Sequence, residues 1–277
     1  MNMKLGIYTN LHKDIDGKAA LALIDILDKR GIEYSISTNE IIPQIKNTIP
    51  LEDLSKSSDI VVAFGGDGTM LNVISYIDDK AIPILGVNMG KVGFLTEIDK
   101  KDIELAVDLL ISGEYSIDTR SLVRAQISSG EKFYALNEVI LTSAKAHVAS
   151  VKINIDNSYT ATIRGDGVMV ATPTGSTAYS LSCNGPILSP SVQAFIVNTI
   201  CPHSLHYVPM VVEDSSEIVL SSSSKNMKLV VDGKEKYKFV DVAEIKIRKA
   251  SFNAQFVRLK NQNFYQKLLQ KLSFWGE

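Results

Sequence analysis

The stretch from Asp59 to Thr69 constrains the fold of this chain more than any other. Asp59–Phe64 reads Asp-Ile-Val-Val-Ala-Phe, a short and largely β-branched run that predicts a buried strand. Gly65-Gly66-Asp67-Gly68-Thr69 follows, and its three glycines let the backbone turn sharply and approach a ligand closely. Apolar residues at helical spacing then run from Met70 to Ile77, so the loop is expected to join a strand to the start of a helix.

The position of this loop points to phosphate chemistry. Free N–H groups and the dipole at a helix N-terminus favour a bound phosphate. The carboxylate of Asp67 repels an anion, so it is expected to orient a hydroxyl, accept its proton or hold a metal. The alternative is a tight turn with a solvated Asp67.

Strands and helices alternate on both sides of this loop. Such alternation over about a hundred residues predicts an α/β domain with a parallel, doubly wound sheet. Ligands bind such sheets at the carboxyl ends of the strands, where this loop and a second glycine loop at 88–94 both fall. The expected strands are 4–9, 32–37, 59–64 and 82–87, and the expected helices are 19–27, which Gly31 ends, and 99–112.

From Tyr115 the pattern changes to short strands separated by turn residues, which predicts a mainly-β, sandwich-like domain. The tail from Phe264 to Leu272 has helical spacing and is expected to pack back on the first domain. The predicted domains are therefore 1–117 and 118–254, with 255–277 as the returning segment. The expected strands are 122–127, 133–141, 151–155, 168–171, 218–220, 229–231, 245–247 and 256–259, and the turns are Ser129-Gly130, Asp156-Asn157 and Asp232-Gly233.

Composition excludes several classes of function. The chain has 277 residues, which favours two domains, and its net charge of −2 gives no support for binding nucleic acid. Cys183 and Cys201 lie in no metal-binding spacing and suggest no disulfide framework, so a cytoplasmic location is expected. Met1–Thr9 has no signal-peptide core, and no apolar run approaches the roughly 20 residues of a membrane helix.

The pair Asn137-Glu138 interrupts an otherwise apolar strand. Buried polar groups without partners are unfavourable, so both side chains are expected to have a ligand or a protein partner. Together they offer the donors and acceptors that bind ribose hydroxyls. The alternative is a strand end with both side chains in solvent.

Arg164-Gly165-Asp166-Gly167 places two glycines around a carboxylate. Close backbone approach would let Asp166 bind an amide or a hydroxyl. Asp-Gly is also a strong hairpin signal, so an ordinary hairpin turn is the alternative.

The segment from Thr172 to Ser182 is rich in hydroxyl groups, which occupy seven of its eleven positions. Pro173 and Gly175 fix a turn, and Ser176 or Thr177 is expected to cap a short helix through Ser182. Such a segment suits a phosphate or a nucleotide, and an ordinary capped helix is the alternative.

Taken together and in this order, the motifs resemble bacterial NAD kinases. The resemblance rests on Gly65–Thr69, Asn137-Glu138, Gly165–Gly167 and Thr172–Ser182, and on Gly86–Gly90 continued through Gly93–Thr96. It spans nearly the whole chain. Diacylglycerol, sphingosine and 6-phosphofructo- kinases share a similar glycine-aspartate loop and are not expected to carry the three later motifs together.

The resemblance implies transfer of a phosphoryl group from ATP, or from polyphosphate, to the 2′-hydroxyl of the adenosine ribose of NAD. It also implies a divalent metal, Mg²⁺, and a homo-oligomer, either dimer or tetramer. Asp67 is implied as the general base or hydroxyl-orienting carboxylate, Asn137 and Glu138 as ribose contacts, and Asp166 as a contact to the nicotinamide end. The further implied binding residues are Gly68, His147, Arg164, Thr174, Thr177, Ala178, Tyr179, Ser180, Leu181, Ser182 and Lys234.

Two other functions stay open on the residues alone. A lipid or sugar kinase would use the same glycine loop and would leave the Asn137-Glu138 pair unexplained. A non-catalytic NAD(H)-binding regulator would bind the dinucleotide without turnover, and the intact Asp67 argues against it. The chain contains no Walker lysine motif, so donor phosphates would be held by the glycine loop, the metal and scattered donors.

Overall fold

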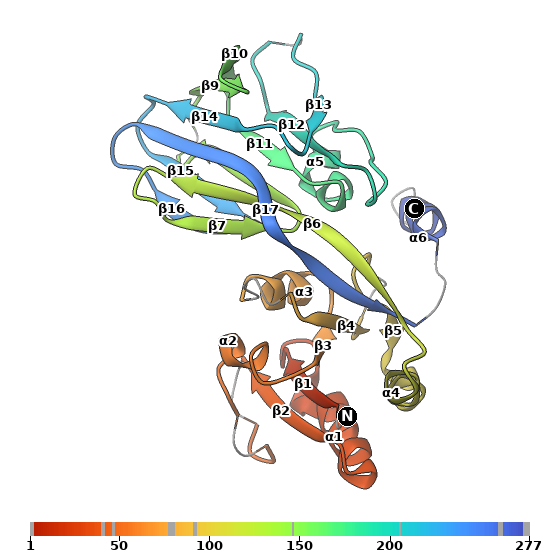
Figure 1. The fold of residues 1–277 in the computed structure, drawn as a ribbon. Helices are drawn as coiled ribbons and strands as arrows, with labels where there is room; N and C mark the ends of the chain where they lie inside the picture. The colour runs from red at the N-terminus through yellow and green to blue at the C-terminus, as the bar shows by residue number, and fades with distance from the viewer. Residues whose placement is uncertain are drawn as a thin grey trace. The chain divides into compact units, whose positions relative to one another are not determined.

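A computed structural model describes residues 3–39, 42–45, 48–76, 81–90, 93–145, 147–204, 206–259 and 263–273. The chain forms two compact units. In Figure 1 the ribbon is coloured by residue number, from red at the N-terminus to blue at the C-terminus. Unit 1 is Met1–Thr119 with Ala254–Glu277, and unit 2 is Arg120–Asn253. The division into independently folding domains stays a prediction.

Unit 1 is built on a parallel sheet in the order β2-β1-β3-β4. The short strand β5 and the last residues of β17 each pair with β4, also in parallel. The predicted parallel α/β arrangement is therefore confirmed for this unit. The strands are β1 (Lys4–Thr9), β2 (Glu33–Thr38), β3 (Ile60–Gly65), β4 (Pro83–Asn88) and β5 (Ile98–Asp99).

Helices α1 and α4 of unit 1 bury apolar stripes against this sheet. In α1 the stripe includes Leu23 and Leu27, which share one core with Phe64, Val87 and Leu110. Gly31 ends α1 in the left-handed conformation at φ 65°, the usual role of glycine after a helix. The helical segments are η1 (Ile15–Gly17), α1 (Lys18–Arg30), α2 (Leu51–Leu54), α3 (Asp67–Ile74), η2 (Lys100–Asp102), α4 (Ile103–Ser112) and α6 (Phe264–Ser273).

Unit 2 is a sandwich of two sheets, which confirms the predicted fold class. One sheet has the order β13-β12-β11-β8-β15-β16, and the other contains β10-β9-β14-β17 together with β6 and β7. Side chains from both sheets, such as Val139, Phe195, Val151 and Ile245, form one buried core. The elements are β6 (Ser116–Ile127), β7 (Lys132–Ala135), β8 (Glu138–Ser143), β9 (Ala149–Ile155), β10 (Ser158–Gly165), β11 (Gly167–Ala171), η3 (Thr174–Thr177), α5 (Tyr179–Ser182), β12 (Ala194–Ile200), β13 (Met210–Glu213), β14 (Ile218–Ser222), β15 (Met227–Val231), β16 (Lys234–Lys238) and β17 (Ala243–Arg258).

Two of the expected hairpin turns have the predicted chemistry. Asp156-Asn157 has φ values of 49° and 63°, and Asp232-Gly233 has 46° and 75°. Two successive left-handed residues define the tight turn that matches the twist of antiparallel strands. The two turns accordingly join the antiparallel pairs β9–β10 and β15–β16.

Two expectations about the strands are wrong, and one alternative is excluded. The single strand expected at 133–141 is two strands, β7 and β8, which belong to different sheets and are separated by Leu136 and Asn137. The strands expected at 245–247 and 256–259 are parts of one 16-residue strand, β17. Exposed polar residues interrupt the apolar pattern of the sequence there, but the strand itself continues through them. The 164–167 segment is no hairpin, since β10 and β11 pair with other strands.

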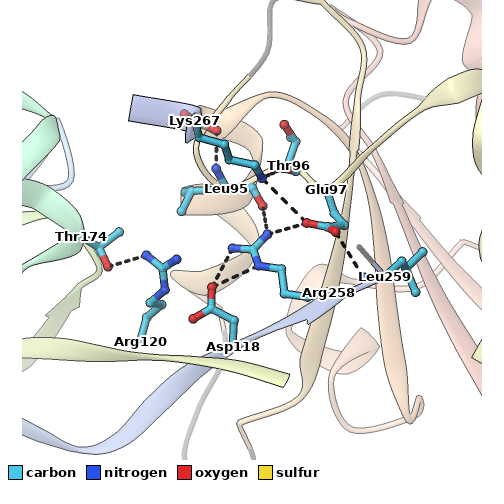
Figure 2. Close-up of polar contacts among 10 residues, drawn as sticks. Leu95, Thr96, Glu97, Asp118, Arg120, Thr174, Arg258, Leu259 and Lys267 are labelled. Carbon is cyan, nitrogen blue, oxygen red and sulfur yellow. Dashed lines mark hydrogen bonds and ion pairs between the residues drawn. The ribbon is translucent and has the colours of Figure 1, made fainter. Parts of the chain in front are cut away.

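A buried ion network fixes the end of β17 within unit 1 (Figure 2). The Glu97 carboxylate is fully buried, and its oxygens accept from Arg258 Nη1 at 3.1 Å and from the backbone N–H of Leu259 at 3.1 Å. The same guanidinium donates to Asp118 at 2.9 Å, and Lys267 of α6 lies 3.8 Å from Glu97. The network therefore connects the start of β6, the end of β17 and the helix α6 to Glu97, which lies between β4 and β5.

Candidate active site

The glycine-aspartate loop ends β3 and begins α3. Gly66 is the N-cap residue, so Asp67 and Gly68 form the first turn of the helix. A β-carbon on Gly65 would lie 2.7 Å from the Cγ2 of Thr69, whereas β-carbons on Gly66 and Gly68 would meet no atom within 4 Å. Gly65 is thus required for packing, and Gly66 and Gly68 leave the backbone at the helix start uncovered.

Asp67 joins this loop to the second glycine loop. Its Oδ2 accepts from the backbone N–H of Phe94 at 2.9 Å, and its Oδ1 accepts from that of Leu95 at 3.0 Å. Lys271 Nζ lies 3.4 Å from Oδ2, and a third of the Asp67 side chain remains exposed. The carboxylate is therefore held in one orientation and can still be reached by a small polar group. Lys91 and Val92 of the second loop, and Ile77 after α3, lie outside the described residues.

In unit 2, Asp232 clamps the backbone around the Asn137-Glu138 pair. Its carboxylate accepts from the N–H groups of Leu136 at 2.8 Å, Asn137 at 2.8 Å and Glu138 at 3.1 Å. These donors lie where the chain crosses from β7 to β8. The clamp explains why the strand breaks here: the N–H groups are used by Asp232. Burial raises the pKa of the Asp232 carboxyl, although the three N–H groups oppose the shift.

Glu138 is the buried carboxyl group of this cluster. Its side chain is 5% exposed, and among the described residues Oε2 has no hydrogen-bond partner. Burial, followed by repulsion from Asp232, raises the pKa of Glu138 to about 8. At neutral pH the group is therefore largely a protonated acid that can both donate and accept a hydrogen bond, which suits a pair of hydroxyl groups.

Several hydroxyl groups of the 172–182 segment bond to protein groups in and around the segment. Thr172 Oγ1 donates to the carbonyl of Leu136, and Ser176 Oγ donates to the carbonyl of Pro173 at 2.6 Å. The Oγ1 of Thr174 accepts from Arg120 at 3.3 Å (Figure 2). The expected side-chain cap by Ser176 or Thr177 is wrong: Ala178 precedes α5, and neither η3 nor α5 has a side-chain cap. The hydroxyls are used on carbonyl groups within and near the turn instead.

The turn at Gly175 brings this segment against the Asn137-Glu138 pair. A β-carbon on Gly175 would lie 2.7 Å from the Cα of Asn137, so only glycine fits there. The N–H of Thr172 also donates to the carbonyl of Asn137 at 2.8 Å. The structure therefore places these two predicted motifs side by side.

Asp166 and His147 line one open cavity of about 380 Å³ with Thr142 and Lys145. Both side chains are exposed, and so is Arg164 at the end of β10. The glycines around Asp166 serve backbone packing: β-carbons there would lie 2.8 Å from the carbonyl oxygen of Cys201 and 2.5 Å from that of Leu141. The close approach expected of the backbone at Gly165 and Gly167 is thus an approach to the backbone of Cys201 and Leu141.

Electrostatic effects link the remaining predicted residues of unit 2. Burial, then the neighbouring Cys183 and Cys201, raise the pKa of the Tyr179 phenol, and Asp166 adds to the shift. Burial and Cys201 also raise the pKa of the Cys183 thiol, with a further contribution from Glu138. Asp166 therefore lies within Coulombic reach of Tyr179, and Glu138 lies within Coulombic reach of Cys183, which follows α5. Thr177 and Ala178 precede α5, Ser180, Leu181 and Ser182 lie on it, and Lys234 begins β16 two residues after Asp232.

Two polar residues of these clusters were missed from the sequence. The sequence indicates only a hairpin turn at Asp232, and the Asp-Gly pair carries no signal for the role of the side chain. Lys271 lies in the helical tail, where a lysine normally indicates a solvated face. Asp232 contacts residues that lie 94 to 96 positions away in the sequence, and Lys271 contacts a residue 204 positions away.

The described residues contain no group of three or more His, Cys, Asp or Glu side chains arranged to hold a metal ion. They do contain one partly exposed carboxylate, Asp67, next to the uncovered helix start. Magnesium is commonly held by one or two carboxylates, water and substrate phosphates, so this arrangement fits a metal that arrives with a phosphorylated substrate.

An uncovered helix start beside a fixed carboxylate, and a β sandwich with a buried polar cluster at Asn137-Glu138, are the features expected of a nucleotide-dependent phosphotransferase. Two models of known protein families match the chain. The ATP-NAD kinase N-terminal domain matches residues 30–115, and the ATP-NAD kinase C-terminal domain matches residues 136–259. The chain belongs to the NAD kinase family, which confirms the resemblance drawn from its motifs.

Relatives and solved structures agree with this assignment. An NAD kinase of Carboxydothermus hydrogenoformans is 40% identical over 80% of this chain and 82% of its own length. One of Methanothermobacter thermautotrophicus is 37% identical over 98% of this chain and 96% of its own. Yeast NADH kinase complexed with NADH has a TM-score of 0.87 at 26% identity, covering 98% of this chain and 87% of that one. An Archaeoglobus fulgidus NAD kinase in complex with ATP has 0.81 at 28% identity, covering 98% and 99%.

Proposed function

We propose that this chain phosphorylates NAD to NADP with ATP as the phosphoryl donor. The observation that carries the proposal is Glu138, a buried carboxyl group with a free oxygen, held beside Asn137 by the Asp232 clamp. A buried polar atom without a partner is unfavourable unless a ligand supplies one. In a member of the NAD kinase family, the ribose hydroxyls of NAD are the ligand that this pair suits.

The acceptor is the 2′-hydroxyl of the adenosine ribose. Asp67 orients this hydroxyl and accepts its proton as the bond from oxygen to the γ-phosphorus forms and the bond to ADP breaks. The backbone around Gly66 and Gly68 offers N–H groups to the donor phosphates. A Mg²⁺ ion bound with ATP would neutralise part of the charge of these phosphates. Polyphosphate presents the same phosphate chemistry and is a second donor to be tested.

The remaining assignments belong to the same proposal. Asp166 with Arg164 and His147 contacts the nicotinamide end, and Lys234 lies near the ligand. Thr174 and the segment from Thr177 to Ser182 line the adenine-ribose site, where Tyr179 and Ser182 are exposed residues. We further propose that the protein is cytoplasmic and forms a homo-oligomer, either a dimer or a tetramer. Light scattering of the purified protein tests the oligomeric state. No helix within the described ranges is both long and apolar enough to cross a membrane.

The substrate class is tested with radiolabelled ATP and a set of acceptors. NAD should be phosphorylated, and 2′-deoxy-NAD should accept no phosphate, because a site built to bind a hydroxyl rejects the analogue that lacks it. Diacylglycerol, sphingosine and fructose 6-phosphate should be inert. Faster labelling of any of these three than of NAD would replace this proposal with a lipid or sugar kinase.

The role of Asp67 is tested with D67N. The variant should bind NAD nearly as well as the wild type and turn over roughly two to four decades more slowly, the range for loss of a general base. Turnover above about a tenth of the wild-type value would exclude Asp67 as the proton acceptor. Tight NAD binding by a wild-type protein without any turnover would instead support the non-catalytic regulator.

A further inference from the structure

The C-terminal helix α6 uses one face to contact the second glycine loop. Phe264, Lys267 and Lys271 follow one another at spacings of three and four residues, which places them on the same side of a helix. The Phe264 ring centre lies 6.3 Å from that of Phe94, and Lys267 Nζ donates to the carbonyl of Thr96 at 3.2 Å. The helix is therefore docked at two points before it reaches Asp67.

The third point on this face is Lys271. Its ammonium lies 3.4 Å from Oδ2 of Asp67 and 4.0 Å from the centre of the Phe94 ring. The ring face attracts the cation, and Phe94 also donates its N–H to the same carboxylate oxygen. The Lys271 side chain, only 23% exposed, is thus held from two sides.

We propose that Lys271 is a positioning residue for phosphoryl transfer, and that its ammonium fixes the Asp67 carboxylate in the orientation that receives the substrate hydroxyl. This inference rests on the proposed function, because it takes Asp67 as the acceptor of the hydroxyl proton. It assigns a role in the reaction to α6, which the sequence suggested only as a packing element.

A count of hydrogen-bond positions supports this role. A carboxylate offers about four acceptor positions, two on each oxygen. The N–H of Phe94 and the Lys271 ammonium use both positions of Oδ2, and the N–H of Leu95 uses one of Oδ1. Among the described donors, one position on Oδ1 is then left, so an arriving hydroxyl meets a single, fixed acceptor. Without Lys271 a second position opens on Oδ2, and the hydroxyl can bind there in a different orientation.

The test compares three single variants of the full-length protein in steady-state kinetics. K271M should lower kcat roughly ten- to hundredfold, the equivalent of one charge-assisted hydrogen bond, with KM for NAD changed less than about twofold. K271R keeps the charge and should restore kcat to within about fivefold of the wild type. K267M removes the same charge from the same face one turn earlier, where it contacts Thr96 and the buried Glu97. It should lower the melting temperature, whereas kcat measured well below that temperature should stay within about twofold of the wild type.

A double variant separates action through Asp67 from an independent effect. If Lys271 acts only through the carboxylate, D67N/K271M should turn over no more than about twofold more slowly than D67N. Four results would overturn the inference: additive losses, an unchanged or higher kcat in K271M, no recovery in K271R, or equal losses in K267M and K271M. A wild-type protein that fails to phosphorylate NAD would overturn the proposed function itself, and this is seen before any variant is made.

Discussion

A β-carbon added to Gly93 would lie 2.8 Å from the Cγ of Asp67 and would overlap its Oδ1. The carboxylate thus occupies the space that any other residue at position 93 would fill. This contact joins the two glycine loops, because the same carboxylate accepts from Phe94 and Leu95. Glycine at position 93 is therefore a requirement of the Asp67 side chain and not only of the local backbone.

We expect G93A to displace Asp67 and lower kcat at least as much as loss of one of its hydrogen bonds, roughly tenfold or more. The matched control is G90A in the same loop, where an added β-carbon meets no atom within 4 Å. Steady-state kinetics of both variants checks the prediction. Equal kcat values for G93A and the wild type would show that the carboxylate can move without consequence.

The raised pKa of Glu138 predicts a specific dependence of stability on pH. The folded protein holds this proton up to about pH 8, whereas the unfolded chain releases it near 4.5. The folded state therefore binds more protons between these values, and the contribution of Glu138 to the free energy of unfolding decreases as pH rises through this window. E138Q removes the titration, so its melting temperature should rise relative to the wild type between pH 5 and pH 8.

The size of this effect is on the order of a few kcal/mol, since each unit of pKa shift corresponds to about 1.4 kcal/mol. Thermal melts of both proteins at matched ionic strength measure it. The difference between the two proteins isolates Glu138 from the other titrating groups, which are common to both. A difference that is independent of pH would mean that Glu138 is ionised in the folded protein.

Asp232 is expected to support NAD binding through the backbone it holds. D232N replaces one accepting oxygen with a donor, which should lower stability by about 1–3 kcal/mol and weaken NAD binding. D156N is the matched control, because Asp156 begins the other Asp hairpin turn and accepts from the N–H of Glu217 at 2.9 Å, outside the Asn137-Glu138 cluster. Urea denaturation and calorimetry with NAD separate the two effects. Unchanged NAD affinity in D232N would show that the clamp is purely structural.

Arg258 should contribute more to stability than an exposed arginine with a similar partner. R258M leaves the buried Glu97 with Lys267 as its nearest cation, and loss of one partner of a buried pair is expected to lower stability by about 3–5 kcal/mol. R248M breaks the pair of Arg248 and Glu217, in which the arginine is more than half exposed, and should lower it by about 1 kcal/mol or less. Urea unfolding curves provide the comparison, and equal losses would contradict it.

The sequence predicted the elements whose character is local. The buried run before Gly65, the helical stripe of α1 and the two left-handed hairpin turns all follow from short-range patterns of side chains and glycines. The resemblance carried by the motifs predicted the family. Periodicity reports which face of an element is buried, and this is why it succeeded there.

Only the tertiary structure decided which strands pair and which polar groups are used. The break at Leu136 and Asn137 depends on a carboxylate that lies 95 positions beyond Asn137, and the orientation of Asp67 depends on Lys271, 204 positions away. The hydroxyl groups between Thr172 and Ser182 look equivalent in sequence, yet several bond to neighbouring carbonyl groups in the fold. Such contacts are set by the path of the whole chain, and a local pattern holds no information about which distant group will arrive.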